Sequence, residues 1–194
     1  MQKITYINQE TVKEINSLRN RGKKIVLCHG AFDLVHPGHM EHFQRAKLLG
    51  DILIVTITGD RFIKKNIQSP YFDEETRYDF LNKIKIIDYV FVVNHYTAVP
   101  VIQKFRPHYY CKGIEYKNSD NVGNLELEKK ALYKSGGKLK FLGKNVQSSS
   151  KFISKIFFKL DDKIIKSNLS NLKLAEVQKT LNKLKNLKVL IVGE

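Results

Sequence analysis

Residues 29–39 read HGAFDLVHPGH and directly follow the apolar run IVLC at 25–28. Three histidines surround Pro37 and Gly38, which belong to the residue types that most often interrupt helices and strands. The stretch stands between a short β-rich run and an amphipathic segment. We therefore expect a strand, a loop that carries chemistry, and a helix, in that order.

Apolar periodicity alternates between strand-like and helix-like along the first 158 residues. The expected strands cover 23–29, 51–58, 89–93, 108–112 and 138–142. The expected helices cover 11–20, 39–50, 73–87, 98–105, 125–135 and 148–158. Strands that alternate with helices over short loops predict an α/β fold, a parallel sheet with helices on both faces. Such sheets bind ligands beyond the carboxyl ends of their strands, where the loop 30–38 lies.

The composition changes after residue 158. Residues 1–158 are expected to form one domain, and 159–187 a polar linker with a separate amphipathic helix. Residues 188–194 (KVLIVGE) read as the first strand of a second domain, in which case the chain is the front part of a longer protein. The alternative is that this run adds a strand to the first domain or to an oligomer.

The chain has a formal net charge of +15, but only six of its 34 Lys and Arg residues are arginine. Proteins that read nucleic acid rely on arginine for bidentate contacts, so we expect a solvated lysine surface and no nucleic-acid partner. Cys28 and Cys111 fall in expected strands and are too few for a disulfide scaffold or a zinc cage. They favour core packing and a cytoplasmic location. No apolar run approaches the roughly 20 residues of a membrane span.

His36 and His39 stand three residues apart at the start of an expected helix, on either side of Gly38. Backbone amides at a helix N-terminus bind anions, and a glycine lets a phosphate approach the backbone closely. Imidazole donors stabilise negative charge that develops on phosphate oxygens. This spacing predicts a site at which a nucleophile displaces a group from phosphorus.

The other histidines near this pair carry weaker signals. His29 ends the first expected strand and fits either packing or lining of the site. His42 follows His39 by about one helical turn and is expected on the surface. A zinc site made of His36, His39 and His42 is not expected, because no cysteine or carboxylate stands nearby at ligand spacing.

GAFDLVHPGH (30–39) resembles the G-x-F-D-x-x-H-x-G-H signature of the cytidylyltransferase-like nucleotidyltransferases. The resemblance is greatest to bacterial heptose-1-phosphate adenylyltransferases and next to glycerol-3-phosphate cytidylyltransferases. Further similar stretches follow in order: LLGDILIVTITGD (48–60), DEETR (73–77), CKGIEY (111–116) and QSSSKFISKI (147–156). The resemblance implies a Rossmann-like fold and a homodimer. It also implies a nucleoside triphosphate carrying Mg²⁺ and a phosphorylated sugar or polyol as substrates.

The same resemblance implies that His36 and His39 bind the triphosphate and stabilise the transition state. Lys64 or Lys65 would offer a cation to the substrate phosphates, and Arg77 would be a phosphate or structural contact. No protein side chain is expected to hold the metal. The nucleotide-binding residues that the resemblance implies are Gly30, Ala31, Phe32, Asp33, Gly38, Arg77, Lys112, Gly113, Ser148, Ser149 and Ser150.

Two departures leave the choice of substrate open. Lys144 stands in a stretch where the glycerol-phosphate enzymes usually carry arginine, and Ile114 replaces the second glycine of the heptose enzymes. The KG-x-[DE]-Y pattern favours ATP and a sugar 1-phosphate, with CTP and a polyol phosphate such as glycerol 3-phosphate as the alternative. A non-catalytic nucleotide- or nucleic-acid-binding module is the alternative outside this class. A sugar kinase domain is expected downstream if the chain belongs to a longer bifunctional protein.

Overall fold

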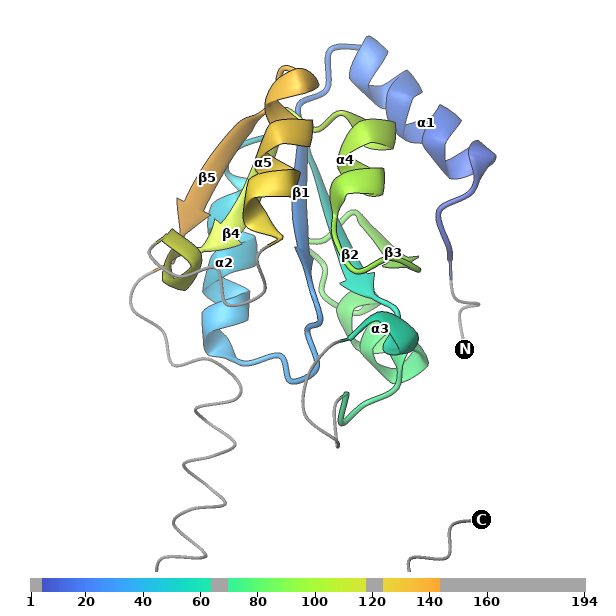
Figure 1. The fold of residues 1–194 in the computed structure, drawn as a ribbon, viewed down its shortest axis with the longest axis vertical. Helices are drawn as coiled ribbons and strands as arrows, with labels where there is room; N and C mark the ends of the chain where they lie inside the picture. Colours follow the sequence, from blue (N-terminus) through green and yellow to red (C-terminus); the bar gives the residue numbers. More distant parts are fainter. Residues whose placement is uncertain (1–4, 64–69, 118–123, 144–194) are drawn as a thin grey trace, which may run out of the picture. The chain divides into compact units, whose positions relative to one another are not determined.

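The computed structural model describes residues 5–63, 70–117 and 124–143, which all belong to one compact unit. These residues form a parallel sheet flanked by helices (Figure 1). None of the helices within these three ranges is long and apolar enough to cross a membrane.

The sheet in the described part of the chain has five parallel strands in the order β3-β2-β1-β4-β5. The strands are β1 (Ile25–Gly30), β2 (Ile52–Thr58), β3 (Tyr89–Val93), β4 (Tyr109–Gly113) and β5 (Lys138–Leu142). The central strands are nearly continuous runs of β-branched and apolar residues because both of their faces are covered. At the centre, Cys28 of β1 pairs with Val55 of β2 on one side and with Cys111 of β4 on the other.

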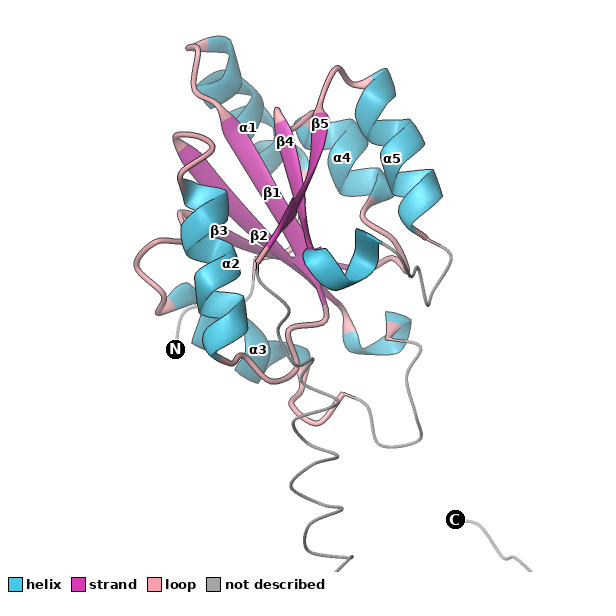
Figure 2. Ribbon diagram, turned by 90° about the vertical axis from the view of Figure 1, so that its left-hand side faces the viewer, coloured by secondary structure: helices cyan, strands magenta, loops and turns pink. Residues whose placement is uncertain are grey.

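The helices cover both faces of this sheet. They are α1 (Gln9–Asn20), α2 (Pro37–Lys47), α3 (Glu74–Asn82), α4 (Val99–Phe105) and α5 (Leu125–Lys134), with short 3-10 turns η1 (Asp60–Phe62) and η2 (Ile114–Lys117). Figure 2 shows α2 and α3 on one face of the sheet and α4 and α5 on the other. Local caps set several ends: the Asp73 carboxylate accepts the Thr76 N–H at the start of α3. The α/β fold predicted from the sequence, a Rossmann-like sheet with helices on both faces, is confirmed.

Two hydrophobic clusters, one on each face, make up the core. Alternate residues of β1 point to opposite faces, so Leu27 joins the cluster under α1, α4 and α5 while Cys28 joins the cluster under α2 and α3. Phe105 is fully buried in the first cluster and Phe43 in the second. Cys111 is buried beside Cys28, so both cysteines are core residues, as predicted.

The sequence predictions missed the ends of several elements. The strands predicted over 23–29, 51–58 and 108–112 are Ile25–Gly30, Ile52–Thr58 and Tyr109–Gly113, and the largest differences are at helix ends. The helix predicted over 39–50 runs from Pro37 to Lys47. It begins earlier than predicted because proline at the first helical position needs no N–H partner and already has a helical φ. The helix predicted over 73–87 ends at Asn82, and the isoleucines that follow it pack on the core from a turn. The strands at 89–93 and 138–142 have the predicted ends. The segments predicted over 148–158, 159–187 and 188–194 lie outside the described residues.

The topology indicates which end of the strands carries the functional site. All strands are parallel, so their carboxyl ends meet at the edge that lies lowest in Figure 1. β1 leads to α2 on one face, whereas its neighbour β4 leads to η2 and then to α5 on the other. Loops that leave adjacent strands toward opposite faces open a crevice between them, and the predicted motif loop lies there.

Candidate active site

The loop after β1 ends at His36, the N-cap residue of α2, whose extended backbone has a φ of −133°. The imidazole Nδ1 of His36 accepts the Gly38 N–H at 3.1 Å. In return, the imidazole Nδ1 of His39 accepts the His36 N–H at 3.3 Å. The two rings therefore cap the helix reciprocally, and their centroids lie 4.0 Å apart.

This capping decides which ring nitrogen carries the proton. A neutral imidazole whose Nδ1 accepts a hydrogen bond holds its proton on Nε2. Burial lowers the pKa of His36, which the charge of Glu115 only partly opposes, so the ring is neutral at pH 7. The Nε2 atom of His36 is buried and has no hydrogen-bond partner among the described residues. A buried unpaired N–H is costly, which makes this atom a candidate donor to a ligand oxygen.

The donors differ from those the sequence predicts. Pro37 has no N–H, the Gly38 N–H is bound to the His36 ring, and the His39 N–H donates to the His36 carbonyl at 2.8 Å. The first amides of α2 are thus occupied and not free for an anion. Both rings accept N–H groups at the positive end of the helix, and His36 presents its Nε2–H as a donor in their place.

An unusual backbone conformation supports the His39 ring. Phe32 has a left-handed φ of 48°, which is costly for a residue other than glycine. Its ring lies 5.3 Å from the His39 ring and 5.3 Å from the Phe43 ring, measured between centroids. A Cβ at Gly30 would lie 3.3 Å from the Phe32 ring, so the glycine leaves room for it. In the described structure the Phe32 ring supports the His39 imidazole, and Gly30 leaves space for the Phe32 ring.

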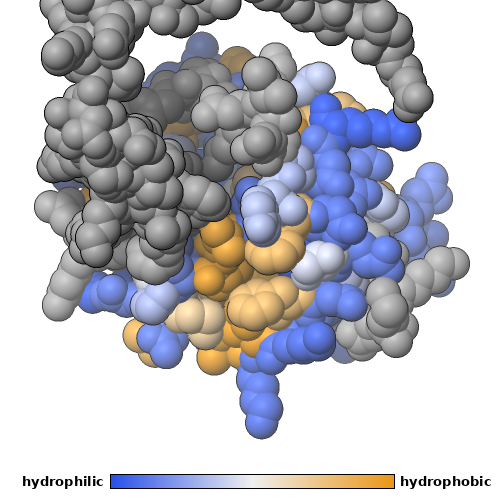
Figure 3. Space-filling model, turned by 90° about the horizontal axis from the view of Figure 1, so that it is seen from below, coloured by the Kyte–Doolittle hydropathy of each residue, from blue (hydrophilic) through white to orange (hydrophobic). Residues whose placement is uncertain are grey.

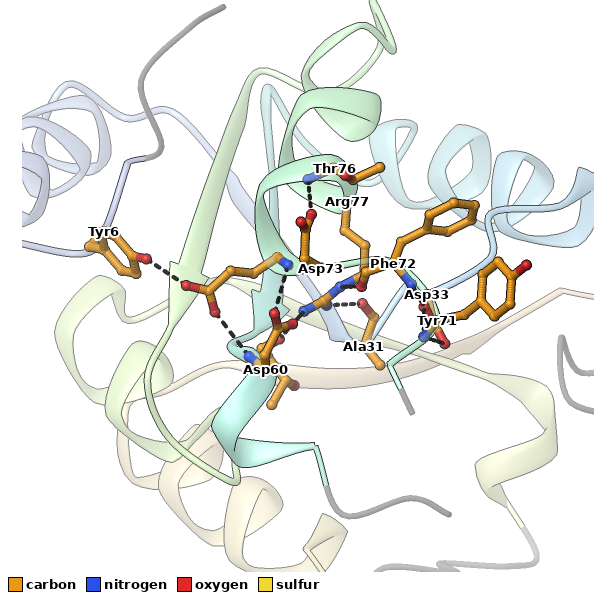
Figure 4. A network of polar contacts seen from close by, with 11 residues as sticks. Tyr6, Ala31, Asp33, Asp60, Tyr71, Phe72, Asp73, Thr76 and Arg77 are labelled. Atoms are coloured by element: carbon orange, nitrogen blue, oxygen red, sulfur yellow. Dashed lines mark hydrogen bonds and ion pairs between the residues drawn. The ribbon is translucent and has the colours of Figure 1, made fainter. Parts of the chain in front are cut away.

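Arg77 of α3 holds the motif loop to the rest of the edge (Figure 4). Its Nη1 donates to the Ala31 carbonyl and its Nη2 to the Thr58 carbonyl at the end of β2, at 2.9 Å. Nη2 also pairs with the Asp60 carboxylate at 2.6 Å. Nε donates to the Phe72 carbonyl at 3.0 Å. The guanidinium is almost fully buried. Arg77 was expected to be either a phosphate contact or a structural contact, and this geometry supports the structural role.

Asp33 ties the same loop to the turn before α3. Its carboxylate accepts the backbone N–H groups of Tyr71 and Phe72, each at 2.9 Å. The carboxylate of Asp33 is thereby committed to the protein backbone. Its place in the motif loop is as predicted, and its contacts are to residues 71 and 72.

On the β4 side of the crevice, Lys112 is held by a buried carboxylate that the sequence analysis missed. Its Nζ lies 3.3 Å from Oε2 of Glu128 and sits over the rings of Tyr110 and Tyr116. Glu128 is 2% exposed and also accepts the Tyr110 hydroxyl and the Ala98 N–H, both at 2.9 Å. The cation of Lys112 is therefore fixed at the end of β4.

A sequence signal for Glu128 does exist. Leu125, Glu128 and Leu132 are all buried on α5, at positions that share one helical face. A carboxylate inside an apolar stripe needs buried partners. The partners themselves come from β4 and the start of α4, which the helix pattern cannot show.

Gly113 and Glu115 complete the β4 side. A Cβ at Gly113 would come within 2.4 Å of the Glu115 carboxylate, so the Glu115 side chain lies directly against the backbone of Gly113. The negative charge of Glu115 raises the pKa of His36, but burial lowers this pKa by more. Glu115 is thus near enough to His36 for its charge to act on the ring, and Gly113 ends β4 beside the strand that leads into the motif loop.

His29 and His42 are both buried, at 8% exposure. Of the two roles expected for His29, the structure shows packing: its Nδ1 lies 2.9 Å from the Thr56 hydroxyl and its Nε2 3.4 Å from the Thr58 hydroxyl. The surface position predicted for His42 is wrong, because this face of α2 packs on the sheet near Leu142. Burial lowers the pKa of His42, although the Leu142 backbone partly opposes it.

Some predicted site residues lie outside the described part of the chain. They are Lys64, Lys65, Ser148, Ser149 and Ser150, whose roles stay predictions. Within the described ranges, no three His, Cys, Asp or Glu side chains gather as ligands for a metal ion.

We predict that Arg77→Lys lowers the free energy of unfolding by about 3 kcal/mol. A lysine ammonium cannot serve three carbonyls and a carboxylate in the planar arrangement that the guanidinium provides. Urea denaturation measures the loss. Arg45→Lys is the matched control, because Arg45 pairs with Glu41 at the surface and its loss should stay within about 0.5 kcal/mol. Equal losses in the two variants would contradict a structural role for Arg77.

We also predict that stability falls as the pH drops from about 6.5 toward 4. Burial, with the Lys112 cation adding to it, lowers the pKa of His29 to about 4. Between these values the unfolded chain binds a proton that the folded chain excludes, so acid favours unfolding. His29→Gln should flatten this dependence in urea titrations at a series of pH values. An unchanged slope would show that His29 does not contribute to it.

Comparisons with known proteins identify the family of this domain. The model of the family described as cytidylyltransferase-like matches residues 27–155. The protein named bifunctional protein HldE of Helicobacter pylori (strain G27) is 37% identical over 114 residues, which are 58% of this chain and 25% of that protein. HldE of Pasteurella multocida (strain Pm70) is 33% identical over 150 residues, 76% of this chain and 30% of that protein.

A solved structure shows the same fold. The crystal structure of a lipopolysaccharide core biosynthesis protein from Thermoplasma volcanium GSS1 aligns with a TM-score of 0.53 at 24% identity, and covers 64% of this chain and 100% of that one. The chain spans about a quarter to a third of the curated relatives named above. The sequence motifs, the fold and the family match together show that the chain belongs to the cytidylyltransferase-like family.

Proposed function

We propose that this domain is a nucleotidyltransferase that transfers AMP from ATP to a sugar 1-phosphate and releases pyrophosphate. The observation that carries the proposal is the buried, unpartnered Nε2 of His36 beside the His39 ring at the start of α2. Family membership, with the signature at 30–39 at the carboxyl edge of β1, supports the same reaction class.

In the proposed reaction an oxygen of the acceptor phosphate attacks the α-phosphorus of ATP. A new P–O bond forms on one side while the bond to the β-phosphate oxygen breaks on the other, and its electron pair leaves with pyrophosphate. Negative charge increases on the α-phosphate oxygens and on the leaving oxygen. Neutral His36, donating from Nε2, stabilises this charge without giving up its proton. Its Nδ1 contact with Gly38 keeps the ring oriented throughout.

Mg²⁺ belongs to the proposal as an ion that the triphosphate carries. The described residues present no three-ligand cluster for a metal. Mg²⁺ in triphosphate-using sites is often bound by phosphate oxygens and water with only one or two carboxylates, so the proposal requires no three-ligand protein cluster. The ion would neutralise phosphate charge and activate pyrophosphate as a leaving group.

The choice of ATP and a sugar 1-phosphate rests on the chain's resemblance to heptose-1-phosphate adenylyltransferases. That resemblance includes CKGIEY at 111–116, which covers the end of β4 and most of η2 and contains Glu115, whose charge acts on His36. The curated relatives share the name HldE, and their description as bifunctional fits a second activity, such as a sugar kinase, in the same polypeptide. A homodimer and a cytoplasmic location remain predictions.

Nucleotide choice is tested by following pyrophosphate release with ATP or CTP and Mg²⁺, across a panel of acceptors. The panel contains D-glycero-D-manno-heptose 1-phosphate, glucose 1-phosphate and glycerol 3-phosphate. We expect turnover with ATP and a sugar 1-phosphate. Turnover with CTP and glycerol 3-phosphate alone would overturn the proposed substrates, and no pyrophosphate release with any pair would overturn the reaction class.

His36→Asn separates capping from catalysis. Asparagine is a good N-cap residue and can accept the Gly38 N–H, but it places no donor where Nε2 stands. We expect kcat to fall by about 10²–10³-fold while the melting temperature is retained. His39→Ala should cost a similar factor.

His108→Asn is the control for these variants. His108 precedes β4 at the amino ends of the strands, away from the motif loop, and its ring accepts the Ile25 N–H. Its kcat should stay within about twofold of the unchanged chain. Full activity in His36→Asn would rule out the proposed role of the Nε2 donor.

A further inference from the structure

Two exposed aromatic side chains stand at the edge that carries the site. Tyr71 is 70% exposed and Phe72 is 37% exposed. Their rings pack edge to face with centroids 5.2 Å apart. Figure 3 shows the molecule from below, toward the carboxyl ends of the strands, where apolar side chains gather in a patch bordered by hydrophilic ones. An exposed aromatic ring leaves apolar area in water that a ligand can cover.

The backbone that carries these rings is fixed. Asp33 accepts the N–H groups of both residues, and Arg77 takes the Phe72 carbonyl. Arg77 also holds the Ala31 carbonyl, so the turn and the motif loop are fastened to each other at two points. Because the backbone of this turn is held on both its N–H and carbonyl sides, a ligand that uses the rings would not have to order the backbone.

This turn lies close to the proposed chemistry. Asp33 contacts the Tyr71 N–H directly and precedes His36 by only three residues, which is at most about 11 Å of extended chain. In Figure 4 Tyr71 lies beside Asp33, at the opposite side of the polar network from Tyr6.

The position relative to β1 indicates which substrate is near. Tyr71 and Phe72 belong to the connection from β2 to α3, whereas Lys112 and Gly113 lie on β4, and β1 separates the two strands in the sheet. The residues expected near the base and ribose are on the β4 side. The β2 side of the motif loop is therefore available to the acceptor.

We propose that Tyr71 and Phe72 form an aromatic platform for the ring of the acceptor sugar, and that they determine preference for cyclic over open-chain acceptors. Sugar rings have an apolar face of C–H groups with partial positive charge, which suits the electron-rich face of an aromatic ring. The platform rests on the proposed function, since it supposes a sugar phosphate acceptor.

The platform is tested with steady-state kinetics of the full chain. Tyr71→Ala should raise KM for glucose 1-phosphate and for D-glycero-D-manno-heptose 1-phosphate about fivefold to tenfold, with KM for ATP unchanged. Any turnover or binding of glycerol 3-phosphate, which has no ring, should be unaffected. Tyr71→Phe keeps the ring and should restore the original KM. Calorimetric titration with each acceptor checks the same order of affinities.

Tyr133→Ala is the matched control, because Tyr133 is 55% exposed on α5. An unchanged sugar-phosphate KM in Tyr71→Ala would overturn the platform while leaving the proposed function intact. A raised KM for ATP alone would overturn it too, by assigning the rings to the nucleotide. A change of oligomeric state in Tyr71→Ala would overturn it by assigning them to a subunit contact. If the unchanged chain neither binds nor turns over any sugar phosphate, the proposed function fails, and the platform fails with it.

Discussion

The guanidinium of Arg77 is the contact on which the functional edge depends. One buried cation gathers the motif loop, the end of β2 and the turn before α3, through three carbonyls and the Asp60 carboxylate. Without the guanidinium, each of these oxygen atoms would lose a hydrogen-bond donor at a partly buried position. The loop after β1 has no regular structure to hold it, so these side-chain bonds set its position, and with it the place from which His36 starts α2.

The start of α2 uses one pair of side chains for two tasks. An imidazole that caps a helix through Nδ1 must carry its proton on Nε2, so the helix cap and the donor geometry are the same hydrogen-bond pattern. Burial keeps His36 neutral and thereby preserves that pattern at neutral pH. The left-handed backbone at Phe32 is locally costly, and it places an aromatic ring against the His39 imidazole.

The two sides of the crevice are built by different means. On the β1 side, backbone carbonyls and amides are held by Arg77 and Asp33. On the β4 side, Glu128 of α5 fixes the ammonium of Lys112 between two tyrosine rings. Each cluster joins segments from different elements, so the relative placement of the motif loop and the end of β4 follows from packing of helices on both faces of one sheet.

Local order along the chain determined the strand–helix alternation, the placement of the loop 30–38 at the strand ends, and the pairing of His36 with His39, because periodicity and three-residue spacing are local properties. Only the tertiary structure decided which donors these histidines present, that Arg77 is buried, and that His42 faces the interior. The same holds for Glu128, whose partners Ala98 and Tyr110 are 30 and 18 residues away in sequence. Hydrogen-bond partners brought together by folding leave no spacing to read, and burial of a polar group depends on what packs against it.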